Sequence, residues 1–205
     1  SNMAIEAGAK CALFTPDEKT AEYCQIELND FQKSLYGDLD ASYIKEIEYS
    51  AEDFEPVLAC PSQVDNIKPV SKLAGTKIDQ VFIGSCTNGR LEDLQKAASI
   101  LKGKKVAPFV KLIVTPASVK IYKQASEDGT LATLIDAGAI VTHPGCGLCC
   151  GRTGGILTDG ERVVATNNRN FLGRMGTSKV EIFLASPMTA AASAVAGEII
   201  SADFE

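Results

Sequence analysis

Three cysteines carry most of the chemistry that this sequence offers. Cys86 lies in the run Gly84-Ser85-Cys86-Thr87-Asn88, and Cys146 and Cys149 form a Cys-x-x-Cys pair. Such a pair lets two thiolates bind one metal centre, and the distant third thiolate brings the protein ligands to three. Three thiolates on an iron–sulfur cube leave one iron open to a substrate, which suits catalysis rather than electron transfer.

The spacing of these cysteines is compatible with three interpretations. His143, the only histidine, precedes Cys146 by three residues, so it could join the three cysteines in a tetrahedral zinc site. The thiols could also be inert and buried. Gly145 and Gly147 favour the cluster, because a tight glycine-containing loop exposes backbone N–H groups that hydrogen-bond cluster sulfides and thiolates.

A second motif carries two arginines. Arg169 and Arg174 lie five residues apart among amides and a glycine, within the run from Asn167 to Arg174. This is a poor pattern for surface ion pairs, but it suits the binding of carboxylates, which a guanidinium holds as a planar fork. The alternative is a polar loop whose arginines are solvated.

Composition limits the class of protein. The chain has 205 residues, 45% of them hydrophobic, and a net charge of −6. Nucleic acids and anionic membranes select basic faces, so neither is an expected partner. No apolar run approaches the ~20 residues that span a bilayer. Seven cysteines without a dense disulfide spacing indicate a reducing cytoplasm, with Cys11, Cys24 and Cys60 as apolar fillers.

The sequence predicts two regions of different character. Residues 1–75 show a weak pattern, which indicates the end of one domain plus a connection. Residues 76–205 alternate short β-branched runs with helical patterns, which predicts an α/β domain with a largely parallel sheet. The expected helices are 2–9, 16–24, 91–102, 117–126, 129–137 and 187–201, and the expected strands are 44–49, 81–84, 110–115, 139–142, 162–166 and 181–185.

Polar motifs follow these strands in order. The Cys86 motif comes after the first strand of the second region, the Cys146 motif after the third, and Asn168 and Arg169 after the fourth. In open α/β sheets, ligands bind at the carboxyl ends of the strands. One edge of the sheet should therefore gather Cys86, Cys146, Cys149, Asn168 and Arg169 into a single site.

Together, these motifs resemble the aconitase superfamily, and in particular the large subunits of its isopropylmalate isomerase and homoaconitase branch. The resemblance covers essentially the whole chain, and three motifs in the same order make it specific. It implies an aconitase-like three-layer α/β domain, preceded by part of a second domain. It also implies a hydro-lyase that isomerises 2-isopropylmalate to 3-isopropylmalate by dehydration and rehydration, in leucine biosynthesis.

The resemblance also implies roles for individual residues. Cys86, Cys146 and Cys149 match the thiolate ligands of a [4Fe-4S] cluster. Asn168 and Asn2 match amides beside the cluster, Glu6 matches an active-site carboxylate, and Arg169 and Arg174 match arginines that hold substrate carboxylates. Asn2 and Glu6 are four residues apart, a spacing that puts them on one face of an α-helix.

The family pattern is incomplete in this chain. Family enzymes have further catalytic residues in an N-terminal domain, and in this branch a small subunit forms a swivelling domain that supplies a serine base. The chain therefore resembles the C-terminal half of a large subunit, which would need that missing half and the small subunit as partners. The alternatives are a homoaconitase- or methylmalate-type dehydratase, or a non-enzymatic metal-binding module.

Overall fold

The computed structural model describes residues 1–29, 33, 36–38 and 40–202, which fall into two compact units. The first is Ser1–Phe54 and the second begins at Glu55. The sequence placed a boundary near residue 75 instead. The difference arises because two short strands, β1 (Val57–Ala59) and β2 (Ile67–Pro69), join the sheet of the second unit.

The first unit contains little regular structure. Helix α1 (Glu18–Cys24) confirms the predicted helix at 16–24, and it begins where the Asp17 carboxylate accepts a 2.9 Å hydrogen bond from the Thr20 amide. A 3₁₀-helix, η1 (Asn2–Ala7), occupies the place of the predicted helix at 2–9. A second 3₁₀ turn, η2, spans Ala51–Asp53.

The strand predicted over residues 44–49 is wrong for this structure. No regular secondary structure forms there, although acidic and apolar side chains alternate over residues 46–49. A strand exists only when neighbouring backbone completes its hydrogen bonds. The described part of the chain gives this segment no strand to pair with.

The second unit is built on a sheet in the order β2-β1-β7-β6-β3-β4-β5. The pairs β3–β4, β4–β5, β3–β6 and β6–β7 are parallel, and only the β1–β2 and β1–β7 pairs are antiparallel. The predicted α/β fold with a largely parallel sheet is confirmed. The five parallel strands are β3 (Gln80–Gly84), β4 (Lys111–Thr115), β5 (Ile140–Val141), β6 (Arg162–Ala165) and β7 (Glu181–Leu184).

Helices cover one face of this sheet. They follow the predicted ranges, except that the helix expected to run to residue 201 ends at Ala196, because Gly197 adopts a left-handed conformation (φ 75°) and caps it. None of the helices in the described residues is both long and apolar enough to cross a membrane. The helices are α4 (Leu91–Leu101), α5 (Val119–Glu127), α6 (Thr130–Ala137) and α7 (Pro187–Ala196).

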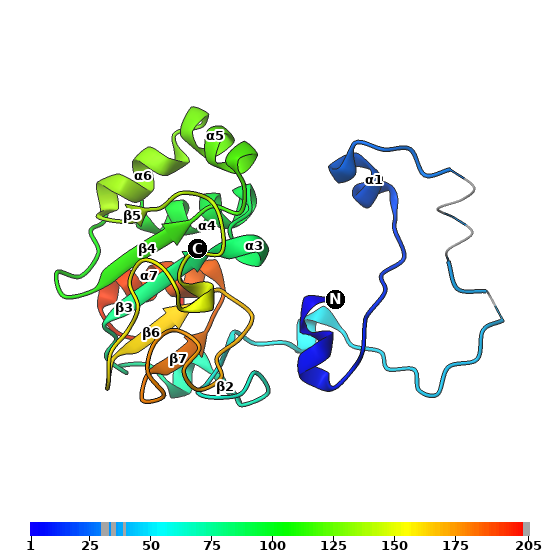
Figure 1. The fold of residues 1–205 in the computed structure, drawn as a ribbon, viewed down its shortest axis with the longest axis horizontal. Helices are drawn as coiled ribbons and strands as arrows, with labels where there is room; N and C mark the ends of the chain where they lie inside the picture. The colour runs from blue at the N-terminus through cyan, green and yellow to red at the C-terminus, as the bar shows by residue number, and fades with distance from the viewer. Residues whose placement is uncertain (30–32, 34–35, 39, 203–205) are drawn as a thin grey trace. The chain divides into compact units, whose positions relative to one another are not determined.

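Loops form the third layer, on the opposite face. Leu148, Leu157 and Met175 are buried there against Phe82 and Ile113 of the sheet. Leu148 belongs to the 3₁₀-helix η4 (Gly147–Cys150), which lies in front of the strands in Figure 1, whereas α7 lies behind them. This arrangement follows from handedness. From β3 the chain adds β4 and β5 successively toward one edge of the sheet. It then returns and adds β6 and β7 on the other side of β3. Because connections between parallel strands are right-handed, the connections to β6 and β7 must cross the opposite face.

Candidate functional site

The order of strands along the sheet reverses between β3 and β6, so the carboxyl ends of these two strands are the expected place for a ligand site. β3 and β6 are parallel neighbours, but the strands that follow β3 lie on one side of the pair and the strand that follows β6 lies on the other. Ligands of α/β proteins bind at such a point. The loops that follow them are joined by hydrogen bonds. The Thr166 hydroxyl accepts one from the Gly84 amide at 2.9 Å, and the Thr166 carbonyl accepts one from the Asn88 side chain.

Cys86 is presented by the sharp end of β3. It lies in the single-turn helix α3 (Ser85–Asn88) and is exposed. Gly84 allows this turn, because a Cβ atom there would lie 2.0 Å from the Thr115 carbonyl oxygen. Ser85 follows with φ 70°, and its buried hydroxyl has no hydrogen-bond partner. A strained, buried serine beside an exposed thiol is typical of a functional turn.

Cys146 and Cys149 are presented by η4 and the residue before it. Cys146 is exposed, and Cys149 is half-buried and donates its amide to the Cys146 carbonyl at 3.1 Å. Two contacts hold this turn against the sheet: Leu148 is fully buried, and Gly147 packs so closely on Thr115 that a Cβ atom would lie 2.5 Å from the Thr115 Oγ1 atom. The cysteine loop is therefore fixed by its apolar and glycine residues, which leaves the thiols at the surface.

Arg174 joins the arginine motif to the cysteine loop. Its Nε donates to the Cys149 carbonyl at 2.5 Å, and its Nη2 lies 3.6 Å from the Cys149 Sγ. The guanidinium also stacks over the Phe171 ring, 5.3 Å from its centroid. Two residues that lie 25 positions apart in sequence, Cys149 and Arg174, thus meet. The predicted gathering of Cys86, Cys146, Cys149, Asn168 and Arg169 into one site stays a prediction.

The loop after β6 is shaped by amides that the sequence analysis did not assign. The Asn167 side chain donates to the Arg169 carbonyl at 2.7 Å, and the buried Asn170 side chain donates to the Cys60 carbonyl at 2.8 Å. These bonds fix the backbone on both sides of Asn168 and Arg169, which are half-buried. The sequence feature that could have indicated these bonds is the asparagine-rich run itself, in which three of four residues are amides.

The described residues contain no group of three His, Cys, Asp or Glu side chains placed to hold a metal ion. Cys86 and the Cys146–Cys149 pair nevertheless lie on the loops that follow β3 and β5, at the same edge of one sheet. All three are free thiols that are exposed or half-buried. By the chemistry of its donors, this set fits a thiolate-bound iron–sulfur centre.

The remaining cysteines separate into two kinds. Cys60 is buried in the core, and burial raises the pKa of its thiol, so the filler interpretation holds. Cys11 and Cys24 are exposed, so that interpretation is wrong for them. Cys150 is half-buried, and its thiol points to the Gly147 carbonyl at 3.6 Å.

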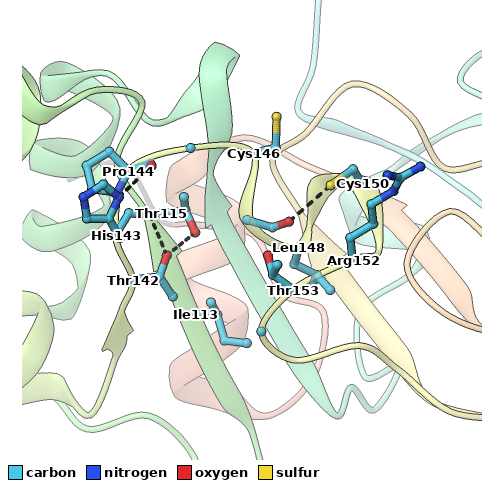
Figure 2. A pocket seen from close by; sticks show the side chains of 13 residues that line it. Ile113, Thr115, Thr142, His143, Pro144, Cys146, Leu148, Cys150, Arg152 and Thr153 are labelled. Atoms are coloured by element: carbon cyan, nitrogen blue, oxygen red, sulfur yellow. Dashed lines mark hydrogen bonds between the residues drawn. The ribbon is translucent and has the colours of Figure 1, made fainter.

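A cavity of about 540 Å³ lies between the ends of β4 and β5 and the cysteine loop. Ile113 and Leu148 contribute apolar lining, and His143 and Arg152 contribute groups that can carry positive charge. Figure 2 shows the Cys146 thiol pointing away from Thr115 and Thr142, two of the three threonines that line the cavity. A cavity with apolar and cationic lining suits small organic anions.

Asn2 and Glu6 belong to the first unit, on η1. The prediction that they share one helix face assumed an α-helix and is wrong for this structure. In a 3₁₀-helix residues three apart are eclipsed, so residues four apart point in different directions. Their roles beside a cluster stay predictions.

The fold and site define a class: an α/β protein whose cysteine and arginine loops meet at the switch point of a parallel sheet. The model of the aconitase family (aconitate hydratase) matches residues 1–76 and 65–197. The chain belongs to the aconitase family.

Among curated proteins of the family, the chain is similar to large subunits of two named enzymes. The chain is 54% identical over 203 residues to the 3-isopropylmalate dehydratase large subunit of a Sulfurihydrogenibium species, covering 99% of this chain and 47% of the relative. It is 52% identical over 203 residues to a Pyrococcus furiosus 3-isopropylmalate dehydratase large subunit (98% and 48%). It is 50% identical over 197 residues to the Thermus thermophilus homoaconitase large subunit (96% and 46%). The chain thus spans about half the length of these relatives.

Proposed function

We propose that this chain supplies the cluster-binding half of a cytoplasmic iron–sulfur hydro-lyase that isomerises 2-isopropylmalate to 3-isopropylmalate. The observation that carries the proposal is the contact between Arg174 and Cys149. It joins a group that can bind carboxylates to a loop that can bind a metal centre. A structural metal site has no need of carboxylate clamps.

Cys86, Cys146 and Cys149 would hold a [4Fe-4S] cluster. When bound, the cluster supplies a Lewis-acidic iron without a thiolate ligand, which can polarise the hydroxyl that leaves as water. Asn168 would hydrogen-bond the cluster side of the site, as would Asn2.

The arginines would bind and orient the substrate. A hydroxy-dicarboxylate carries two charges at neutral pH, and Arg169 and Arg174 can each hold one carboxylate through paired N–H groups. Fixing both carboxylates places the α-proton and the hydroxyl in one orientation, which lowers the entropic part of the barrier. Glu6 would contribute a carboxylate to the same site.

Proton abstraction would require a further polypeptide. The family's serine base belongs to the small subunit, and no residue of this chain matches it. The small subunit and the preceding half of the large subunit are therefore the proposed partners. The Thermus relative is named a homoaconitase, so the hydroxy acid of a homoaconitase-type dehydratase is the second candidate substrate.

Anaerobic reconstitution with iron and sulfide tests the proposal. We expect about four irons and four sulfides per chain, with loss of one iron in air. Cys86→Ser, Cys146→Ser and Cys149→Ser should each abolish the visible chromophore. Cys150→Ser is the matched control, since Cys150 adjoins Cys149 but is not a proposed ligand, and it should keep the chromophore. Stoichiometric zinc binding that depends on His143, without cluster formation, would contradict the proposal.

A further inference from the structure

The described residues of the first unit form no core of their own. Among the described side chains of Ser1–Phe54, none is buried. Large apolar side chains are instead at the surface, including Leu13 (92% exposed) and Phe14 (78%). A segment of this length must bury apolar area to offset the entropy of ordering its chain. The described residues of this unit show no such burial.

The part of this unit with the most informative pattern is the segment Tyr43–Phe54. Tyr43, Ile44, Ile47, Tyr49 and Phe54 are all exposed, and Ile44 is fully so. Between residues 46 and 49 apolar and acidic side chains alternate, which is the pattern of a strand with one covered face. We name residues 44–49 the unpaired strand segment, because they have the sequence of a strand but no strand partner in the described structure.

The negative charge around this segment limits which surfaces could cover it. Between Asp38 and Glu55 the sequence has seven carboxylates and one lysine. A complementary surface therefore needs an apolar strip flanked by basic side chains, since like charges across an interface oppose association.

We propose that the unpaired strand segment pairs with a sheet edge of the polypeptide that corresponds to the other half of the large subunit. The chain spans about half the length of its relatives. The family model matches it in two ranges, residues 1–76 and residues 65–197. Residues 1–76 are thus a recognisable piece of the family fold, while 1–54 bury no described side chain. The identity of the occupant rests on the proposed function; the exposure of the segment does not. Backbone pairing would supply affinity, and Ile47 and Tyr49 would supply register.

Hydrogen exchange measured by mass spectrometry tests this pairing. The probe is the N-terminal part of the Sulfurihydrogenibium large subunit that this chain does not match, used both co-expressed as a separate polypeptide and fused ahead of this chain. In the chain alone, amides 44–49 should exchange at rates close to those of an unfolded peptide. With the probe present they should slow on the order of 100-fold or more, as expected for paired strands.

A matched pair of variants separates a specific contact from general apolar surface. Ile47 and Ile135 are each 56% exposed, and Ile135 lies on α6 in the second unit. Ile47→Asp should weaken co-purification with the probe at least about tenfold and return amides 44–49 to fast exchange. Ile135→Asp should change neither.

The proposal would be overturned by protection of amides 44–49 in the chain alone, by fast exchange of those amides in the folded fusion, or by equal effects of the two variants. Self-association of the chain through this segment, seen by light scattering, would also overturn it by making a second copy the occupant. None of these measurements needs a cluster or activity. If the segment fails to pair but four irons are still bound, this proposal fails and the proposed function stands. If the segment pairs but no iron is bound, this proposal stands and the proposed function fails.

Discussion

At the scale of single residues, the site depends on contacts that fix backbone rather than on the reactive groups themselves. Arg174 holds the Cys149 carbonyl, and Asn170 holds the Cys60 carbonyl. Each bond satisfies a carbonyl in a loop that has no ladder partner. Of the thiols proposed as ligands, those of Cys86 and Cys146 are exposed and that of Cys149 is half-buried.

Replacing Arg174 should loosen the cysteine loop. In Arg174→Lys a single ammonium replaces the guanidinium fork, so the contacts with the Cys149 carbonyl and sulfur cannot both be made. We expect amides 146–151 of the metal-free chain to exchange about fivefold faster, which corresponds to the loss of about 1 kcal/mol. Hydrogen exchange at neutral pH measures this.

Arg152→Lys is the control for that variant, because Arg152 is exposed on the same loop and makes no contact with Cys149 in the hydrogen-bond pattern of the described residues. It should leave exchange of amides 146–151 unchanged. Equal exchange in the two variants would show that Arg174 does not hold the loop.

At the scale of elements, strand ends decide where the motifs lie. Strand β3 stops at Gly84, and the chain turns at once into α3, because a glycine there can pass beside the Thr115 carbonyl of β4. The carboxyl ends of β3 and β4 therefore stay in close contact up to the site. A larger residue at this point must separate the two strands.

Gly84→Ala should destabilise the second unit strongly. The added Cβ atom would lie 2.0 Å from backbone, which cannot move without disturbing the β3–β4 pairing. We expect the free energy of unfolding in urea to fall by more than about 3 kcal/mol.

Gly103→Ala is the matched control, since Gly103 also has a positive φ (73°) but open space around it. It should cost only the backbone strain, about 1–2 kcal/mol. If both variants lose the same stability, the close approach at Gly84 does not matter.

At the scale of the whole molecule, this chain holds only part of the proposed catalytic machinery. It contains the cysteines proposed as cluster ligands and the arginines proposed to bind carboxylates, but proton abstraction needs a base within hydrogen-bond reach of the substrate carbon. The chain spans about half the length of its relatives, so the rest of the site would come from further polypeptide.

Turnover should therefore be absent from this chain alone, even with a full cluster. We expect activity only when the other half of the large subunit and a small subunit are added, measured as formation of the alkene intermediate from 2-isopropylmalate. The complete Sulfurihydrogenibium large subunit with the same small subunit is the positive control. Turnover by the isolated 205 residues would contradict the division of roles proposed here.

The sequence alone determined the parts of the protein that depend on local pattern. Apolar periodicity predicted the five parallel strands and four covering helices of the second unit, because buried strands and amphipathic helices need those side chains wherever they pack. The order of polar motifs after strands also predicted one site at a single edge of the sheet, since parallel strands end at one edge; the gathering of Cys86, Cys146, Cys149, Asn168 and Arg169 there stays a prediction.

Only the tertiary structure decided the features that depend on distant neighbours. It placed β1 and β2 in the second unit, set Arg174 on Cys149, and turned η1 into a 3₁₀-helix on which Asn2 and Glu6 no longer share a face. It also left residues 44–49 without the strand that their pattern predicts. Side-chain alternation is a property of the segment, but a strand is a property of a pair, so a sequence can specify a strand that forms only when its partner is present.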